Sequence, residues 1–206
     1  IRAGAGVVAK VARAMHFAHE RGVIHRDLKP QNIMIDEESG EPKILDFGLA
    51  KNVDSKQLQQ LTQMGAFLGT PAYMAPEQAG GDPNAVDRRA DTYALGAILY
   101  EVLTGRPPFT GSTAINVIKK VLKEDPTPPQ EVFAQAEPRL SKIALKALAK
   151  DPDERYQSAA DFADAVEGVI GRVTRTLGDS GVVSDPGEGG GDSGTKPGFF
   201  GRLFGA

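Results

Sequence analysis

Residues 91–105, Asp-Thr-Tyr-Ala-Leu-Gly-Ala-Ile-Leu-Tyr-Glu-Val-Leu-Thr-Gly, are the sequence feature that most constrains the fold. The segment predicts a helix whose side chains are apolar on nearly every side. A helix of this kind has to lie inside a domain, because no face of it suits water. The sequence therefore predicts a mainly helical domain built around residues 91–105.

The chain as a whole has the composition of a soluble globular domain. Its 206 residues are 40% hydrophobic and 25% charged, which is enough for one substantial core. The net charge of −3 gives no support for nucleic-acid binding. The chain has no cysteine, which excludes a disulfide framework, a thiolate metal site and a cysteine nucleophile. We expect a cytoplasmic protein, with membrane association of the full-length protein as an alternative.

The N-terminal segment contains a motif that resembles a glycine-rich nucleotide loop, Gly4-Ala5-Gly6-Val7-Val8-Ala9-Lys10-Val11. No strand precedes it, and its apolar residues recur at steps of three and four, so we predict an amphipathic helix over residues 4–21 that ends at Gly22. His16 and His19 are three residues apart and could share a metal. Without a matching acidic or cysteine ligand, an ordinary surface or packing pair is favoured.

Residues 25–32, His-Arg-Asp-Leu-Lys-Pro-Gln-Asn, form a polar loop between two predicted strands at 23–24 and 33–35. The Asp27 carboxylate can accept a proton, the Lys29 ammonium can hold a phosphate, and the Asn32 amide can ligate a hard cation. The loop therefore indicates a phosphoryl-transfer site. Taken alone, it could also be a turn that happens to be charged.

Asp46-Phe47-Gly48 follows a third predicted strand at 42–45, so Asn32 and Asp46 are expected side by side at a metal. Further on stands Gly69-Thr70-Pro71-Ala72-Tyr73-Met74-Ala75-Pro76-Glu77. In order and spacing, the three blocks resemble the catalytic loop, metal-binding loop and activation-segment end of a bacterial eukaryotic-type (Hanks-type) serine/threonine protein kinase.

The resemblance implies an α+β fold that is mainly α, a kinase C-terminal lobe: a helical bundle with short β-hairpins at the catalytic cleft. It covers residues 1–171, with further helices expected at 112–123, 140–149 and 158–170. Residues 172–206 are rich in glycine and are predicted to form a flexible tail. The aromatic terminus at 199–204 could contact a membrane surface or a partner, or could be a plain disordered end.

The resemblance also implies an activity, the transfer of the ATP γ-phosphate to Ser or Thr hydroxyls of protein substrates. Asp27 would orient the hydroxyl and accept its proton, and Lys29 would neutralise the transferred phosphoryl group. Asn32 and Asp46 would bind ATP through Mg²⁺, with Mn²⁺ as an alternative. Thr70 would contact Asp27 and Lys29 and shape the acceptor site.

Regulatory and structural roles follow from the same resemblance. Thr62 is the expected phosphorylation site in the activation segment, and Arg26 is the cation that would pair with its phosphate. Asp91 would accept hydrogen bonds from the catalytic-loop backbone, or would simply be a helix N-cap. Glu77 and Arg155 would form a buried ion pair.

The family places a nucleotide-binding N-terminal lobe before the catalytic loop, and the printed sequence has no counterpart of its glycine-rich loop or lysine. The missing N-lobe would then be a required partner, and we expect the chain alone to have little activity and to expose an apolar seam. Two alternatives stay open: a noncatalytic kinase-like interaction module, and a small-molecule phosphotransferase of the aminoglycoside-kinase type.

Overall fold

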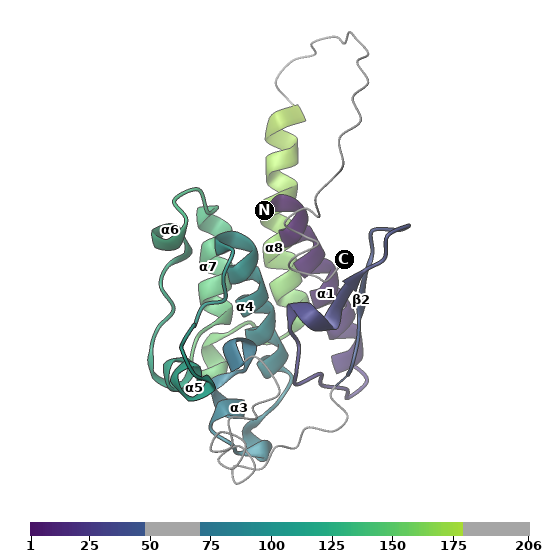
Figure 1. The fold of residues 1–206 in the computed structure, drawn as a ribbon. Coiled ribbons are helices and arrows are strands. Elements are labelled where there is room, and N and C mark those ends of the chain that lie inside the picture. The colour runs from purple at the N-terminus through teal and green to yellow at the C-terminus, as the bar shows by residue number, and fades with distance from the viewer. Residues whose placement is uncertain (48–70, 179–206) are drawn as a thin grey trace.

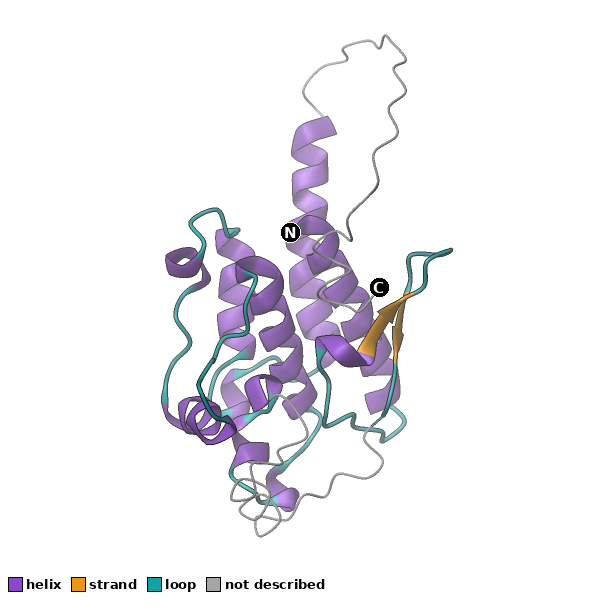
Figure 2. Cartoon of the chain, viewed as in Figure 1, coloured by secondary structure: helices purple, strands orange, loops and turns teal. Residues whose placement is uncertain are grey.

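The computed structural model describes residues 1–47 and 71–178, and the described part is mainly helical (Figure 1; Figure 2). The only strands described in these ranges form one small hairpin. The helices are α1 (Arg2–His19), α3 (Pro76–Ala79), α4 (Arg89–Thr104), α5 (Ala114–Lys123), α6 (Pro129–Val132), α7 (Pro138–Ala147) and α8 (Ala159–Gly178), and the strands are β1 (Ile33–Ile35) and β2 (Pro42–Ile44). Short 3₁₀ turns occupy Pro30–Asn32, Pro71–Tyr73, Pro83–Ala85 and Pro152–Glu154.

Helix α4 lies at the centre of the domain, as its sequence predicts. Of its 16 residues, 13 are buried, and it packs against α1 and α7 (Figure 1). Gly96 allows the close approach of α7, because a Cβ at this position would lie 2.6 Å from the Ala147 Cβ. The helix ends at Gly105, whose φ of 78° is the left-handed conformation that glycine adopts without strain.

Helices α1 and α8 pack side by side and close the other flank of the core (Figure 1). Val8, Val11 and Met15 of α1 are buried, which agrees with the predicted amphipathic face and excludes a glycine-rich nucleotide loop at residues 4–11. On the exposed side, Arg13 forms ion pairs with Asp164 and Glu167 of α8.

The hairpin sets the position of the predicted metal ligands. Strands β1 and β2 are antiparallel, with Ile33 opposite Ile44. Beyond this pair, the Leu45 N–H donates to the Asn32 carbonyl at 2.8 Å. Asn32 and Asp46 therefore lie at the same end of the hairpin, because Asp46 follows directly after Leu45.

The strand predicted at 23–24 is absent. Gly22 turns the chain out of α1 with a φ of 74°, and the Val23 N–H donates to the Ala18 carbonyl at 3.0 Å. This N–H therefore completes the end of the helix instead of a β-ladder.

Helix α8 is longer than the predicted 158–170. It runs to Gly178, so the proposed boundary between residues 171 and 172 falls inside a helix. The rest of the predicted tail lies outside the described residues. Within 1–47 and 71–178, no helix has both the length and the apolarity that a bilayer-spanning segment requires.

Candidate active site

The loop at residues 25–32 is fastened to the core by Asp91. This side chain is 1% exposed, and its carboxylate accepts the backbone N–H groups of His25 at 2.9 Å and Arg26 at 2.8 Å. Helix α4 has Arg88 as its N-cap, so Asp91 lies within the first turn and is not the cap. The contact between Asp91 and the loop backbone is the one that the family resemblance implies. A buried carboxylate needs such donors, since an unpaired charge in the core is strongly unfavourable.

His19 supplies the third donor to Asp91, and this role was missed in the sequence. Its Nε2 lies 2.8 Å from the Asp91 carboxylate, and both side chains are buried. His19 is therefore a structural residue of the loop support, not an ordinary surface residue. His16 is half-buried, and its Nδ1 has no hydrogen-bond partner among the described residues. Within these residues, no group of three or more His, Cys, Asp or Glu could hold a metal.

His25 joins the loop to the segment that carries Asp46. Its side chain is fully buried, and its Nε2 lies 3.0 Å from the Leu45 carbonyl oxygen. A carbonyl can only accept, so Nε2 carries the proton and Nδ1 is left to accept the Asp27 N–H, which lies 3.3 Å away. The His25 ring also stacks at a tilt on Phe47, with 5.0 Å between centroids. His25 therefore fixes the loop that carries Asp27 and the segment that carries Asp46 relative to one another.

Asp27 and Lys29 are brought together by the loop. The Lys29 Nζ lies 2.9 Å from the Asp27 Oδ2, and the Asn32 amide nitrogen donates to the Asp27 carbonyl at 2.8 Å. The two charged side chains are 27% and 17% exposed, so each keeps access to solvent. The loop thus presents a carboxylate and an ammonium at one partly open point.

Asn32 and Asp46 have the chemistry that a magnesium ion requires. The Asn32 amide nitrogen is used by the Asp27 carbonyl, which leaves the amide oxygen as the atom for a cation. Asp46 is exposed and has a φ of 51°, an unusual conformation for a residue other than glycine. Mg²⁺ is commonly held by one or two protein oxygen ligands together with substrate phosphates, and this donor set fits that pattern.

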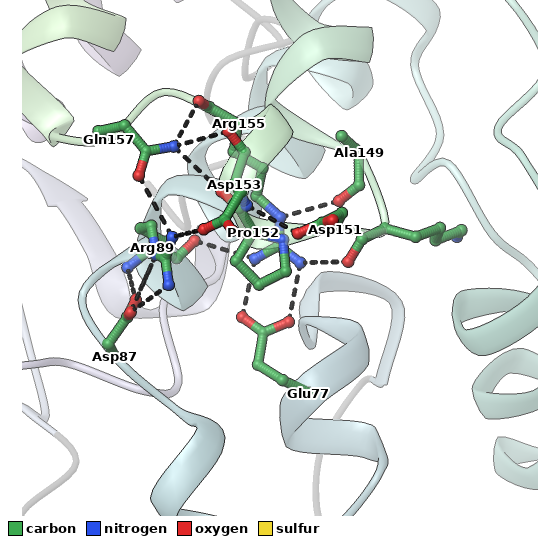
Figure 3. Close-up of polar contacts among 10 residues, drawn as sticks. Glu77, Asp87, Arg89, Ala149, Asp151, Pro152, Asp153, Arg155 and Gln157 are labelled. Atoms are coloured by element: carbon green, nitrogen blue, oxygen red, sulfur yellow. Dashed lines mark hydrogen bonds and ion pairs between the residues drawn. The ribbon is translucent and has the colours of Figure 1, made fainter.

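The predicted ion pair between Glu77 and Arg155 is present, with Glu77 in the first turn of α3 (Figure 3). The Arg155 guanidinium donates to both carboxylate oxygens at 2.7 and 2.8 Å. It also donates to the carbonyls of Ala149, Arg89 and Lys150. The same region contains a second arginine contact, in which Arg89 bridges Asp87 and Asp153 (Figure 3).

Gln78, the residue after Glu77, links α3 to the loop at residues 25–32, and this role was also not predicted from the sequence. Its amide nitrogen donates to the Arg26 carbonyl at 2.7 Å. The Arg26 side chain is partly exposed. Three positions considered in the sequence, Gly48, Thr62 and Thr70, lie outside the described residues.

The fold and the loop together define a protein kinase C-terminal lobe. The model of the protein kinase domain matches residues 2–165. The chain therefore belongs to the protein kinase family, and the resemblance noted in the sequence is confirmed.

Among curated proteins, the chain is similar to bacterial serine/threonine-protein kinases. It is 46% identical over 161 residues to serine/threonine-protein kinase PknB of Mycobacterium tuberculosis, which covers 78% of this chain and 25% of the relative. It is 45% identical over 156 residues to PknB of Mycolicibacterium smegmatis, covering 76% of this chain and 24% of the relative. A probable PknB of Corynebacterium glutamicum is 40% identical over 175 residues, covering 83% and 26%. The chain spans about a quarter of the length of these relatives.

Proposed function

We propose that this chain carries the catalytic loop of a serine/threonine protein kinase, which transfers the γ-phosphate of ATP to Ser or Thr hydroxyls of proteins. The observation that carries the proposal is the pairing of Asp27 with Lys29 at 2.9 Å in a partly exposed loop. The similarity to relatives named serine/threonine-protein kinase supports the same activity.

In this proposal, Asp27 is the residue that meets the substrate hydroxyl. Its carboxylate accepts the hydroxyl hydrogen bond, orients the oxygen toward the phosphorus and takes up the proton. Lys29, held beside it, places a positive charge where negative charge develops on the transferred group. The Asp27 backbone is held at its N–H by His25 and at its carbonyl by Asn32, so the carboxylate starts from a fixed position.

Asn32 and Asp46 would hold Mg²⁺ on the ATP phosphates, through the amide oxygen and the carboxylate. When bound, the ion supplies neutralisation of phosphate charge and a template for in-line transfer. The protein prepares this site by fixing the end of the hairpin, where the Leu45 N–H bonds to the Asn32 carbonyl. Thr70 is proposed to contact Asp27 and Lys29 from the activation segment.

Regulation is proposed through phosphorylation of Thr62. A phosphate carries close to two negative charges and forms strong hydrogen bonds to arginine. Arg26 is the neighbouring cation in the catalytic loop, and its backbone is fixed by Asp91. A phosphate bound by Arg26 would therefore order the activation segment next to Asp27.

The experiment that tests the function is Asp27→Asn in the full natural chain. The substitution keeps the shape of the side chain and removes its ability to accept the proton. We expect phosphate incorporation from radiolabelled ATP into a Ser/Thr peptide to fall by at least about 100-fold, with thermal unfolding unchanged. Asp125→Asn, at an exposed position beyond α5, is the matched control and should leave incorporation unchanged.

The result also separates the proposal from its main alternative. Wild-type rates in the Asp27→Asn protein would contradict a catalytic role for this loop. If the unsubstituted natural full-length protein incorporates no phosphate with either Mg²⁺ or Mn²⁺, a noncatalytic interaction module becomes the better interpretation.

A further inference from the structure

Arg26 has an unusual backbone conformation at a position that controls Asp27. Its φ is 64°, in the left-handed region that non-glycine residues seldom adopt. A residue persists there only where the surrounding structure holds it. The carbonyl of Arg26 and the N–H of Asp27 belong to one planar peptide unit, so the orientation of this unit sets the direction in which the Asp27 side chain leaves the backbone.

Two side chains from different helices hold the backbone of Arg26. On one side, the Arg26 N–H donates to Asp91 of α4 at 2.8 Å. On the other, the Arg26 carbonyl accepts from the Gln78 amide nitrogen of α3 at 2.7 Å. The Asp91 contact is the one implied by the family resemblance. The Gln78 contact is additional, and it acts directly on the peptide unit that includes Asp27.

The chemistry of this contact requires an amide. While its nitrogen donates to Arg26, the Gln78 side-chain oxygen accepts the Ala75 N–H at 3.1 Å at the start of α3. An amide can donate and accept at once, whereas an ionised carboxylate can only accept. A glutamate at this position would therefore keep the bond to Ala75 and lose the bond to Arg26.

Gln78 is itself held in place by its neighbour. Glu77 is fixed by the buried Arg155 guanidinium at 2.7 and 2.8 Å, so the short helix α3 cannot move without breaking an ion pair. A series of contacts thus runs from Arg155 through α3 and Gln78 to the peptide of Asp27. These contacts connect the end of the activation segment to the catalytic loop.

We propose that Gln78 is a positioning residue for Asp27: its amide holds the Arg26–Asp27 peptide, so that the position of α3 determines the orientation of the catalytic carboxylate. The inference rests on the proposed kinase function and extends it to a residue outside the three sequence motifs. Gln78 acts through Arg26 and is not assigned any contact with substrate.

The test compares Gln78→Glu and Gln78→Met in the full natural chain. Both variants lose the donor to Arg26, and we expect kcat to fall on the order of 10-fold or more, because small misplacements of a catalytic group are costly. The KM for ATP should change by less than about twofold, because Gln78 is assigned no contact with the nucleotide.

The pH profile distinguishes positioning from a general loss of structure. A protonated glutamic acid can donate to the Arg26 carbonyl, so the kcat of Gln78→Glu relative to wild type should rise as pH is lowered from about 8 to about 5.5. The same ratio for Gln78→Met should stay flat. Gln130→Glu on α6, which packs against α4 and α7, is the matched control and should keep wild-type kcat.

Hydrogen exchange supplies a readout that does not need catalysis. Loss of the Gln78 bond should speed amide exchange at residues 26 and 27 while leaving the interior of α4 protected. Wild-type exchange at these amides together with wild-type kcat in both Gln78 variants would overturn the inference. If Asp27→Asn still strongly reduces phosphate incorporation in that case, the proposed function stays intact. Full activity in Asp27→Asn would overturn both.

Discussion

Loss of Arg155 should destabilise the domain far more than loss of an arginine on the surface. The Arg155 side chain has no solvent exposure, and that of its partner Glu77 is 8% exposed. Removing one member of such a pair leaves the other charge in a low-dielectric environment, which costs roughly 3 to 5 kcal/mol. Arg155→Met should lie toward the upper end of this range, at about 4 to 5 kcal/mol, because the guanidinium also donates to three backbone carbonyls.

The same contacts predict a smaller effect for the partner residue. Glu77→Gln retains one oxygen that can accept from the guanidinium, and Arg155 keeps its three carbonyl contacts. The guanidinium nevertheless loses its counter-charge, so the cost should lie at the lower end of the range for a broken buried pair, about 3 kcal/mol. The predicted order is Arg155→Met above Glu77→Gln.

Urea denaturation of the purified protein measures these differences, with Arg139→Met as the matched control. Arg139 pairs with Glu137 at 2.9 Å, but the two side chains are 48% and 30% exposed, so its loss should cost less than about 1 kcal/mol. In a thermal scan, 4 to 5 kcal/mol corresponds to a fall of about 8 to 20 °C for a domain of this size. If Arg155→Met and Arg139→Met reduce the free energy of unfolding equally, the argument from burial is wrong.

Two further predictions concern one buried and one partly buried carboxylate, Asp91 and Glu101. Asp91→Asn offers one accepting oxygen to the two N–H groups of His25 and Arg26, so we expect a loss of about 1 to 3 kcal/mol in urea denaturation and a reduced kcat; unchanged values of both would contradict the anchoring role. Burial raises the pKa of the Glu101 carboxyl above its ordinary value of 4.5, although a hydrogen bond from the Tyr73 hydroxyl opposes this. Between about pH 4.5 and the raised pKa, the folded state then binds more protons than the unfolded state. The free energy of unfolding should therefore fall as pH rises through the raised pKa. Glu101→Gln should flatten this dependence in unfolding curves recorded from pH 4 to 8, and an unchanged slope would exclude Glu101 as its source.

The central helix was predictable because its signal is local. Residues 91–105 are apolar on nearly every side of the helix, so its burial follows from composition and period alone. The ends of helices are less predictable from the sequence than their interiors. Helix α5, for example, begins at Ala114 instead of the predicted residue 112. The reason is a cap: the Thr113 hydroxyl accepts the Asn116 N–H and ends the preceding loop.

The support of the loop at residues 25–32 was less predictable, because it depends on contacts between distant parts of the chain. Asp91 was found only through the family resemblance. His19 and Gln78 reach Asp91 and Arg26 across 72 and 52 residues of sequence, and no local pattern separates them from other polar side chains on helices. One usable signal existed for Gln78. It stands three residues after Ala75, at the position where a capping-box glutamine bonds back to the helix start.

Burial separates two kinds of carboxylate that look alike in the sequence. Asp27, Asp46, Glu77 and Asp91 each stand beside an apolar segment, yet the structure places them in different environments. Asp91 and Glu77 are almost fully buried and are paired with donors, as buried charges must be. Asp27 is 27% exposed and Asp46 is exposed, so both can exchange water for a substrate or a cation. In the proposed function, the exposed pair meets the substrate or cation, and the buried pair holds the structure around it. Removal of a buried carboxylate should therefore reduce stability, whereas removal of an exposed one should reduce the rate and leave stability unchanged.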